Sequence, residues 1–199
     1  MRIFVIGASG TIGSAVTAEL KPRHEVITGG RHSGDVRLDV HDSASIRAAF
    51  EELRSVDAVV SATGAVKFGP FEELEAADYV MSLRNKLLCQ VNLVLIGRDY
   101  VSERGSFTLT SGVLDVDPIV GGTAASMANG AINAFVLAAS IEMPSGQRIN
   151  AVSPGVIEES MGHYGPFFRG FEPVPARRAA LAYSKSVEGA RTGHVFRVA

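Results

Sequence analysis

The chain has 199 residues, of which 46% are hydrophobic and 20% are charged. This length and composition can bury one substantial core and call for no second domain, so we predict a single domain over residues 1–199. Nineteen basic and twenty-one acidic residues give a formal net charge of -2, and the basic residues form no runs. We therefore expect no nucleic-acid partner.

Membrane, secretory and metal-binding classes are also disfavoured. The longest mostly apolar stretches, residues 91–96 and 131–141, are much shorter than the ~20 residues that cross a bilayer, so we expect no membrane association. The chain starts with a strand-like segment in place of a basic, cleavable leader, which predicts a cytoplasmic protein. The single cysteine, Cys89, cannot form an internal disulfide, and the five histidines lack metal-ligand spacing. We predict no metal site.

In chain order, the predicted elements alternate between strands and helices. An apolar, branched run at residues 2–6 is followed by a glycine loop and by Ile12, Val16 and Leu20 at helical spacing. Further strands are predicted at 25–28, 36–38, 58–61, 106–110, 148–152 and 195–198, and further helices at 43–53, 77–101, 122–142 and 174–188. This order predicts an α/β fold with a doubly wound, mostly parallel sheet of about seven strands and helices on both faces.

Two irregular segments, 112–122 and 158–173, follow strands at the carboxyl edge of the predicted sheet. Loops at that edge line the ligand crevice of doubly wound folds, so both segments are expected to form substrate-site walls. Phe167, Phe168 and Phe171 predict an apolar substrate lid within 158–173.

Three glycines, at positions 7, 10 and 13, directly follow the first strand and open the first helix. Glycine there allows a tight turn, close backbone approach to a pyrophosphate, and close helix–strand packing. The amino terminus of the helix supplies free N–H groups to phosphates. A plain turn is the alternative. We predict a dinucleotide site at Gly7, Ser9, Gly10, Thr11, Ile12 and Gly13.

The end of the second strand carries information on the cofactor. NAD-specific domains place a carboxylate there for the adenosine ribose hydroxyls, whereas this strand ends in two glycines followed by Arg31. A guanidinium can bind a 2′-phosphate, which predicts NADP(H). The alternative is that Arg31 is a solvated surface charge.

Several later motifs follow predicted elements in a familiar order. They are Asp39-Val40, Ala62-Thr63-Gly64, Asn85, Ser111 and Pro154-Gly155-Val156. Together with the glycine loop they resemble the short-chain dehydrogenase/reductase family, over essentially the whole chain. Each also has a plainer interpretation as a helix cap, a turn bond or a strand end.

The resemblance implies a Rossmann-type fold and a role for each motif. Asp39 and Val40 would contact adenine, residues 62–64 would line the cofactor, and residues 154–156 would flank the nicotinamide. Asn85 would support a proton relay, and Ser111 would orient the substrate. The family also forms homo-oligomers, here a dimer or tetramer, through the 122–142 helix and the long helix before it.

The family's catalytic signature, Tyr-x-x-x-Lys, should open the helix after Ser111, and there the chain has Thr123 and Met127. A phenol has an ordinary pKa of ~10, which the neighbouring ammonium lowers. Threonine has no comparable acidity, and positioned acid/base groups contribute ~10²–10⁴ in rate. Tyr164, beside His163, is the replacement donor that we predict, with packing in a lid as the alternative.

The predicted function is an NADP(H)-dependent oxidoreductase that acts on a small carbonyl or alcohol substrate near Ser111. The missing signature supports a second class, a catalytically silent NADP(H)-binding redox sensor. An isomerase or lyase is a third, because a fold does not determine a reaction. Tyr100 and Tyr183 are expected to be structural residues.

Overall fold

The computed structural model describes residues 1–199, and its centre is a seven-stranded sheet with the order β3-β2-β1-β4-β5-β6-β7. Every neighbouring pair of strands is parallel. The strands are β1 (Arg2–Ile6), β2 (Glu25–Gly30), β3 (Val36–Arg37), β4 (Val56–Ser61), β5 (Val101–Thr110), β6 (Arg148–Pro154) and β7 (Val195–Val198). The predicted α/β class, the parallel sheet and the number of strands are confirmed.

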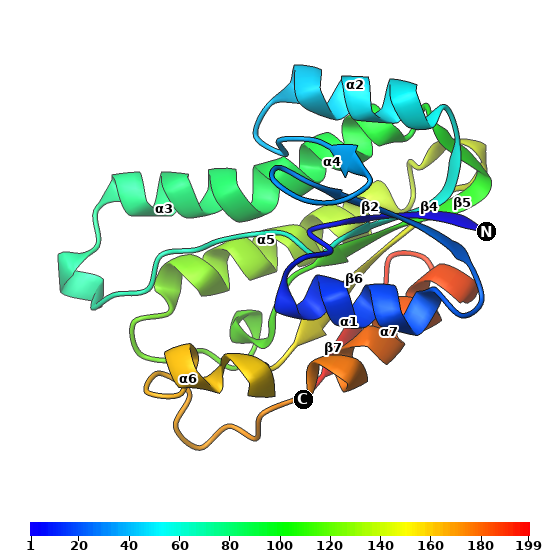
Figure 1. Ribbon diagram of the computed structural model, residues 1–199. Coiled ribbons are helices and arrows are strands. Elements are labelled where there is room, and N and C mark those ends of the chain that lie inside the picture. Colours follow the sequence, from blue (N-terminus) through cyan, green and yellow to red (C-terminus); the bar gives the residue numbers. More distant parts are fainter.

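Helices cover both faces of the sheet, as Figure 1 shows. On one face lie α1 (Thr11–Leu20) and α7 (Ala176–Glu188), and on the other lie α2 (Ser43–Leu53), α4 (Cys89–Gly97) and α5 (Thr123–Ala139). Alternate residues of β1 explain this arrangement. Ile3 and Val5 pack in the α1–α7 core, whereas Phe4 and Ile6 pack against α2 and α4.

The helix predicted at 77–101 is three elements. They are α3 (Ala76–Ser82), a π-helical segment η2 (Leu83–Leu88), and α4, which ends at Gly97. The prediction was wrong at its carboxyl end because β5 begins at Val101, where that residue pairs with Val56 of β4. Only Tyr100 and Val101 are apolar among residues 98–101, which is too few to separate helical from strand periodicity, and the pairing of Val101 with β4 determines the strand.

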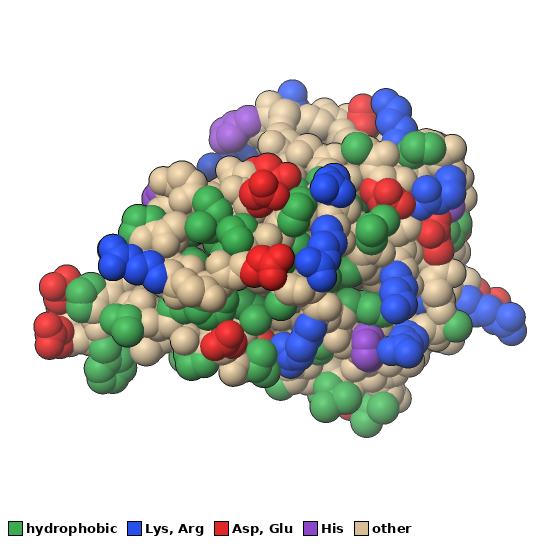
Figure 2. All heavy atoms as spheres, turned by 90° about the horizontal axis from the view of Figure 1, so that it is seen from below, with side chains coloured by type: hydrophobic (Ala, Val, Ile, Leu, Met, Phe, Trp, Pro, Cys, Tyr) green, Lys and Arg blue, Asp and Glu red, His purple; other side chains and the backbone are tan.

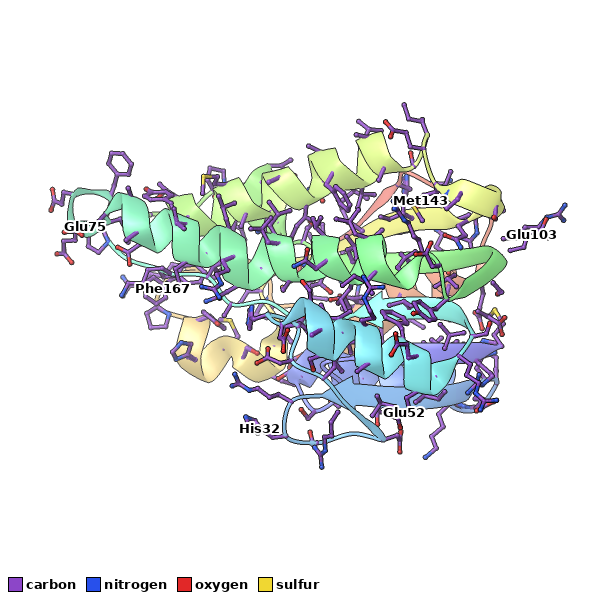
Figure 3. All side chains as sticks on the ribbon, turned by 90° about the horizontal axis from the view of Figure 1, so that it is seen from above. His32, Glu52, Glu75, Glu103, Met143 and Phe167 are labelled. Carbon is purple, nitrogen blue, oxygen red and sulfur yellow. The ribbon has the colours of Figure 1, made fainter.

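Several helical segments lie at the carboxyl edge of the sheet. Figure 1 shows α3 and the start of α5 extending past the sheet at this edge, with the short helix α6 (Met161–Tyr164) below them. Figure 3, from above, shows the rod formed by α3, η2 and α4 lying beside α5. The segment predicted as irregular at 112–122 contains one 3-10 turn, η3 (Val113–Asp115).

The surface carries charges of both signs. Figure 2 shows Lys and Arg interspersed with Asp and Glu on the face seen from below. None of the helices combines the length and the apolar character that a bilayer crossing requires.

Candidate active site

The glycine loop between β1 and α1 has a backbone that only glycine fits. Gly7 has φ +80°, and a Cβ there would lie 2.6 Å from the Ala62 carbonyl oxygen. A Cβ on Gly13 would overlap the Gly7 carbonyl oxygen. At the start of α1, Gly10 provides no side-chain cap, and the first turn holds no acidic residue. The amino-terminal N–H groups of α1 are therefore suited to an anionic ligand, and the loop fits a pyrophosphate.

A cavity of about 290 Å³ opens beside this loop, at the carboxyl edge of the sheet. It brings together residues predicted from distant parts of the sequence. Of the predicted site residues, those on its wall are Gly10, Thr11, Ile12, Ala62, Thr63, Gly64, Ser111, Pro154, Gly155, Val156 and Tyr164. The parallel strands make this possible because β1, β4, β5 and β6 all end at the same edge.

Other predicted site residues lie outside this cavity. Gly7 and Ser9 lie in the turn between β1 and α1, Gly13 lies in α1, and neither these residues nor Asn85 are on the wall. The Asn85 carbonyl oxygen accepts hydrogen bonds from the Ala65 N–H and the Cys89 thiol. The proton relay through Asn85 stays a prediction.

The residues predicted at the adenosine end lie beyond β2 and β3. Arg31 is 63% exposed, and its Nη1 lies 4.0 Å from an Asp39 carboxylate oxygen. Its Nε donates to His32 Nε2 at 2.9 Å. Val40 borders a neighbouring cavity of about 320 Å³, which Cys89 also lines. Arg31 is therefore accessible to a ligand that extends along this edge.

Two polar side chains on the cavity wall lack hydrogen-bond partners. Ser111 and Asn129 are each 2% exposed, and neither Ser111 Oγ nor Asn129 Oδ1 has a partner. The Asn129 amide packs against Gly112, where a Cβ would lie 2.9 Å from its Nδ2. Buried polar atoms are normally paired, so these two atoms point to a ligand that supplies the missing contacts.

The α5 residues that line the cavity differ from the two signature positions. Ala125 and Asn129, four residues apart, line the cavity, whereas Thr123 and Met127 do not. The Thr123 hydroxyl is hydrogen-bonded to the Tyr79 hydroxyl at 2.8 Å, and Met127 is 38% exposed. Neither the signature positions 123 and 127 nor the cavity-lining positions 125 and 129 hold a phenol or an ammonium.

Lys86 is the one charged residue on the cavity wall, and no motif in the sequence predicted it there. It lies in η2, and its Nζ donates to the Ser111 carbonyl oxygen at 3.1 Å. Burial lowers the pKa of Lys86 to about 8. The only available signal was a lysine in an otherwise apolar stretch, and a surface position explains that equally well.

Three tyrosines can be compared directly. Tyr164 lines the cavity and packs in an aromatic group, with ring centroids 5.7 Å from Phe68 and 6.5 Å from Phe168. Tyr100 stacks on Phe50 at 5.6 Å, in the core. Tyr183 is fully buried, its hydroxyl is 2.7 Å from Thr110 Oγ1, and burial raises its pKa. Tyr100 and Tyr183 are structural residues, as predicted.

Comparisons with known proteins identify the family. The family model described as enoyl-(acyl carrier protein) reductase matches residues 12–190. The solved structure of protein lin1944 from Listeria innocua is 52% identical, with a TM-score of 0.97 and full coverage of both chains. No curated protein matches the chain.

Two less similar structures share the fold. A small-chain dehydrogenase in complex with NADPH is 23% identical, with a TM-score of 0.88 and coverage of 100% of this chain and 96% of that one. Ribose-5-phosphate isomerase from Brucella melitensis 16M is 22% identical, with a TM-score of 0.87 and coverage of 99% and 90%. On the family match, which spans most of its length, the chain belongs to the short-chain dehydrogenase/reductase family.

Proposed function

We propose that the protein is an NADP(H)-dependent oxidoreductase that reduces a small carbonyl compound or oxidises the corresponding alcohol. One observation carries the proposal: a single cavity joins the glycine loop to Ser111, whose buried hydroxyl oxygen has no partner. Bound NADPH would supply the hydride. The chain would supply the phosphate site, the substrate contacts and the proton.

The cofactor would lie along the carboxyl edge of the sheet. The start of α1 would hold the pyrophosphate, and the turn at residues 154–156 would flank the nicotinamide. Arg31 supports a preference for the 2′-phosphate, because β2 ends without a carboxylate and the guanidinium is exposed beside Asp39. The small-chain dehydrogenase with the same fold was solved in complex with NADPH.

The substrate would be small and mostly apolar, with one reacting oxygen. Val66, Phe68, Leu114 and Phe168 provide apolar walls, and no carboxylate lines the cavity. Ser111 Oγ would donate a hydrogen bond to the substrate oxygen. We also propose that residues 158–173 act as a lid, since Tyr164 and Phe168 line the cavity from that segment.

The test is reduction of 9,10-phenanthrenequinone, a reactive dicarbonyl, followed by the loss of NADPH absorbance. We expect turnover with NADPH and slower turnover with NADH. Ser111→Ala should lower turnover ~10-fold or more, because one hydrogen bond to the substrate oxygen, which gains negative charge in the reaction, is lost. A wild-type protein that binds NADPH yet reduces no carbonyl would contradict the oxidoreductase proposal.

The redox sensor is the second candidate. The observation in its favour is that Ala125 and Asn129 occupy the α5 positions that face the cavity, so α5 offers no acid/base group. A sensor would bind NADPH tightly without consuming it. The quinone assay distinguishes the two functions, because only the oxidoreductase oxidises the cofactor.

We also propose that the protein forms a homo-oligomer through the outer faces of η2–α4 and α5. Leu88, Leu95, Met127 and Leu137 are exposed on these elements. Such apolar side chains on neighbouring helices are typical of a subunit interface. Sedimentation that shows only monomers at micromolar concentration would contradict this assignment.

A further inference from the structure

We propose that Lys86 donates the proton to the substrate oxygen, so that η2 supplies the acid that α5 lacks. The inference rests on the oxidoreductase function proposed above and names its proton donor. It assigns a catalytic residue outside the helix that carries the family signature.

The first observation that supports this role is the position of the Lys86 ammonium. Lys86 Nζ donates to the carbonyl oxygen of Ser111, and the hydroxyl of the same serine is buried and unpartnered. Both residues lie on the cavity wall. A substrate oxygen that accepts from Ser111 Oγ therefore lies in the neighbourhood of Nζ, where a proton can pass directly or through one water.

The second observation is the unpaired charge of Lys86. Lys86 is the only charged side chain on the wall, and it forms no ion pair. Its one hydrogen bond leaves two ammonium N–H donors without a protein partner. A partly buried cation without a counter-ion destabilises the folded protein. Such a cation is suited to an oxygen that gains negative charge during the reaction.

The backbone is arranged around this lysine. π-Helical turns are rare and occur often at functional sites. Gln90 Nε2 donates to the carbonyl oxygens of both Lys86 and Thr110, which fixes η2 to the end of β5. Gly64, with φ +139°, leaves room for the lysine stem, because a Cβ there would lie 2.7 Å from Lys86 Cγ.

The surroundings adjust the acidity of Lys86. The side chains that face it across the cavity from β5 and α5, Ser111 and Asn129, are uncharged. On its own helix, Cys89 stays a neutral thiol near pH 7, since burial raises the pKa of Cys89 to about 11. Burial lowers the pKa of Lys86 to about 8, against an ordinary value of ~10.4. The ammonium is thus mostly protonated near pH 7 and more acidic than a surface lysine.

The proposed step balances. As hydride from the reduced nicotinamide bonds to the carbonyl carbon, the C=O π pair moves to oxygen, and Lys86 transfers one N–H proton to that oxygen. The products are the alcohol, the oxidised cofactor and a neutral lysine amine. The amine then regains a proton from solvent. Oxidation of the alcohol runs through the same groups in reverse.

The first readout is the titration of Lys86 itself, which needs neither cofactor nor substrate. The chain has only four lysines, so [13Cε]lysine labelling gives few signals, and Lys86→Met assigns the one of interest. We expect Lys86 to titrate near pH 8. Titration of Lys86 near the ordinary value would overturn the proposal.

The second readout is reduction of phenanthrenequinone by NADPH in matched variants. Lys86→Met removes the proton, and Lys86→Arg keeps the charge but binds its proton too tightly to release it. Both should lower kcat by ~10²–10⁴-fold, while Lys185→Met leaves it unchanged. Wild-type kcat/KM should be constant below pH 8 and fall above it, and Lys86→Met should abolish this dependence.

The outcomes separate this inference from the function on which it rests. Wild-type turnover that survives in Lys86→Met would overturn the role of Lys86 alone, as would a pH dependence lost in Tyr164→Phe but kept in Lys86→Met. A wild-type protein that neither binds NADPH nor reduces the quinone would overturn the oxidoreductase proposal, and the proton-donor role with it.

Discussion

The two ends of the cavity are built on different physical grounds. At the glycine loop, backbone overlap dictates the residue type, because Gly7 and Gly13 have no room for a Cβ. At the Ser111 end, side-chain chemistry matters, and any element that reaches the cavity can supply it. There α5 presents Ala125 and Asn129, while the cation comes from η2. Residue spacing therefore identifies the first end and leaves the second to the fold.

One added methyl group should disrupt the glycine loop. Gly13→Ala places a Cβ against the Gly7 carbonyl oxygen, so the loop must shift. We expect a loss of ~1–3 kcal/mol in the free energy of unfolding and a loss of ~10–100-fold in NADPH affinity. Urea denaturation measures the free energy of unfolding, and calorimetric titration measures the NADPH affinity. Gly162→Ala, in α6 with no atom within 4 Å of the added Cβ, is the control; equal behaviour of the two variants would contradict the account.

At the adenosine end, recognition of the 2′-phosphate depends on one exposed charge, that of Arg31. Arg31→Ala should weaken NADPH binding by ~10–100-fold, because a hydrogen bond to a charged group contributes ~1.5–3 kcal/mol. NADH binding should change less than about twofold, since NADH has no 2′-phosphate. Arg177→Ala, an exposed arginine on α7, is the control. Equal losses for both cofactors would contradict the 2′-phosphate assignment.

Removal of the Lys86 cation, at the Ser111 end of the cavity, should stabilise the folded protein. The folded pKa of Lys86, about 8, lies below the unfolded value of ~10.4, so folding penalises the ammonium. The penalty is full below pH 8 and disappears as the pH rises through ~10.4. Lys86→Met should therefore raise the free energy of unfolding by ~1–3 kcal/mol at pH 7.

Urea denaturation at two pH values tests this directly. The stability difference between Lys86→Met and the wild type should shrink between pH 7 and pH 10, because the wild type gains stability over that interval. Lys67→Met, at an exposed position, is the matched control and should change little at either pH. A Lys86→Met protein less stable than the wild type at pH 7 would show that the ammonium has a favourable partner in the folded state.

The smallest effect is expected at Tyr164. Its ring packs against Phe68 and Phe168, and phenylalanine keeps that packing. Tyr164→Phe should leave quinone turnover within about threefold of the wild type, in contrast to the ~10²–10⁴-fold loss for a proton donor. His163→Ala serves as a second control in the same assay. A loss of ~10²-fold in Tyr164→Phe would assign the proton to the tyrosine.

Sequence periodicity predicted the sheet because each parallel strand is a short apolar run between turns. It extended one helix through 98–101, where two apolar residues, Tyr100 and Val101, are too few to mark its end, and only the pairing of Val56 with Val101 determines the strand. It identified Thr123 and Met127 as the signature positions of α5 but not that Ala125 and Asn129 line the cavity. The rotation of a helix about its axis depends on packing that local sequence does not contain.

Lys86 escaped prediction for a related reason. A π-helical turn shifts the phase of the helix, so the 3.6-residue repeat no longer tells which residues face inward. Asn85, the neighbour of Lys86, is absent from the cavity wall, and its part in a proton relay stays a prediction. The glycine loop could be predicted, because backbone sterics require its residues and the direction of a side chain plays no part.

Calorimetric titration of the wild-type protein with NADPH, and separately with NADH, tests the central claim most directly. The account predicts saturable binding of one NADPH per chain, weaker binding of NADH, and reduced affinity for NADPH in Gly13→Ala. Binding of neither cofactor would contradict the claim that the glycine loop and its cavity form a dinucleotide site.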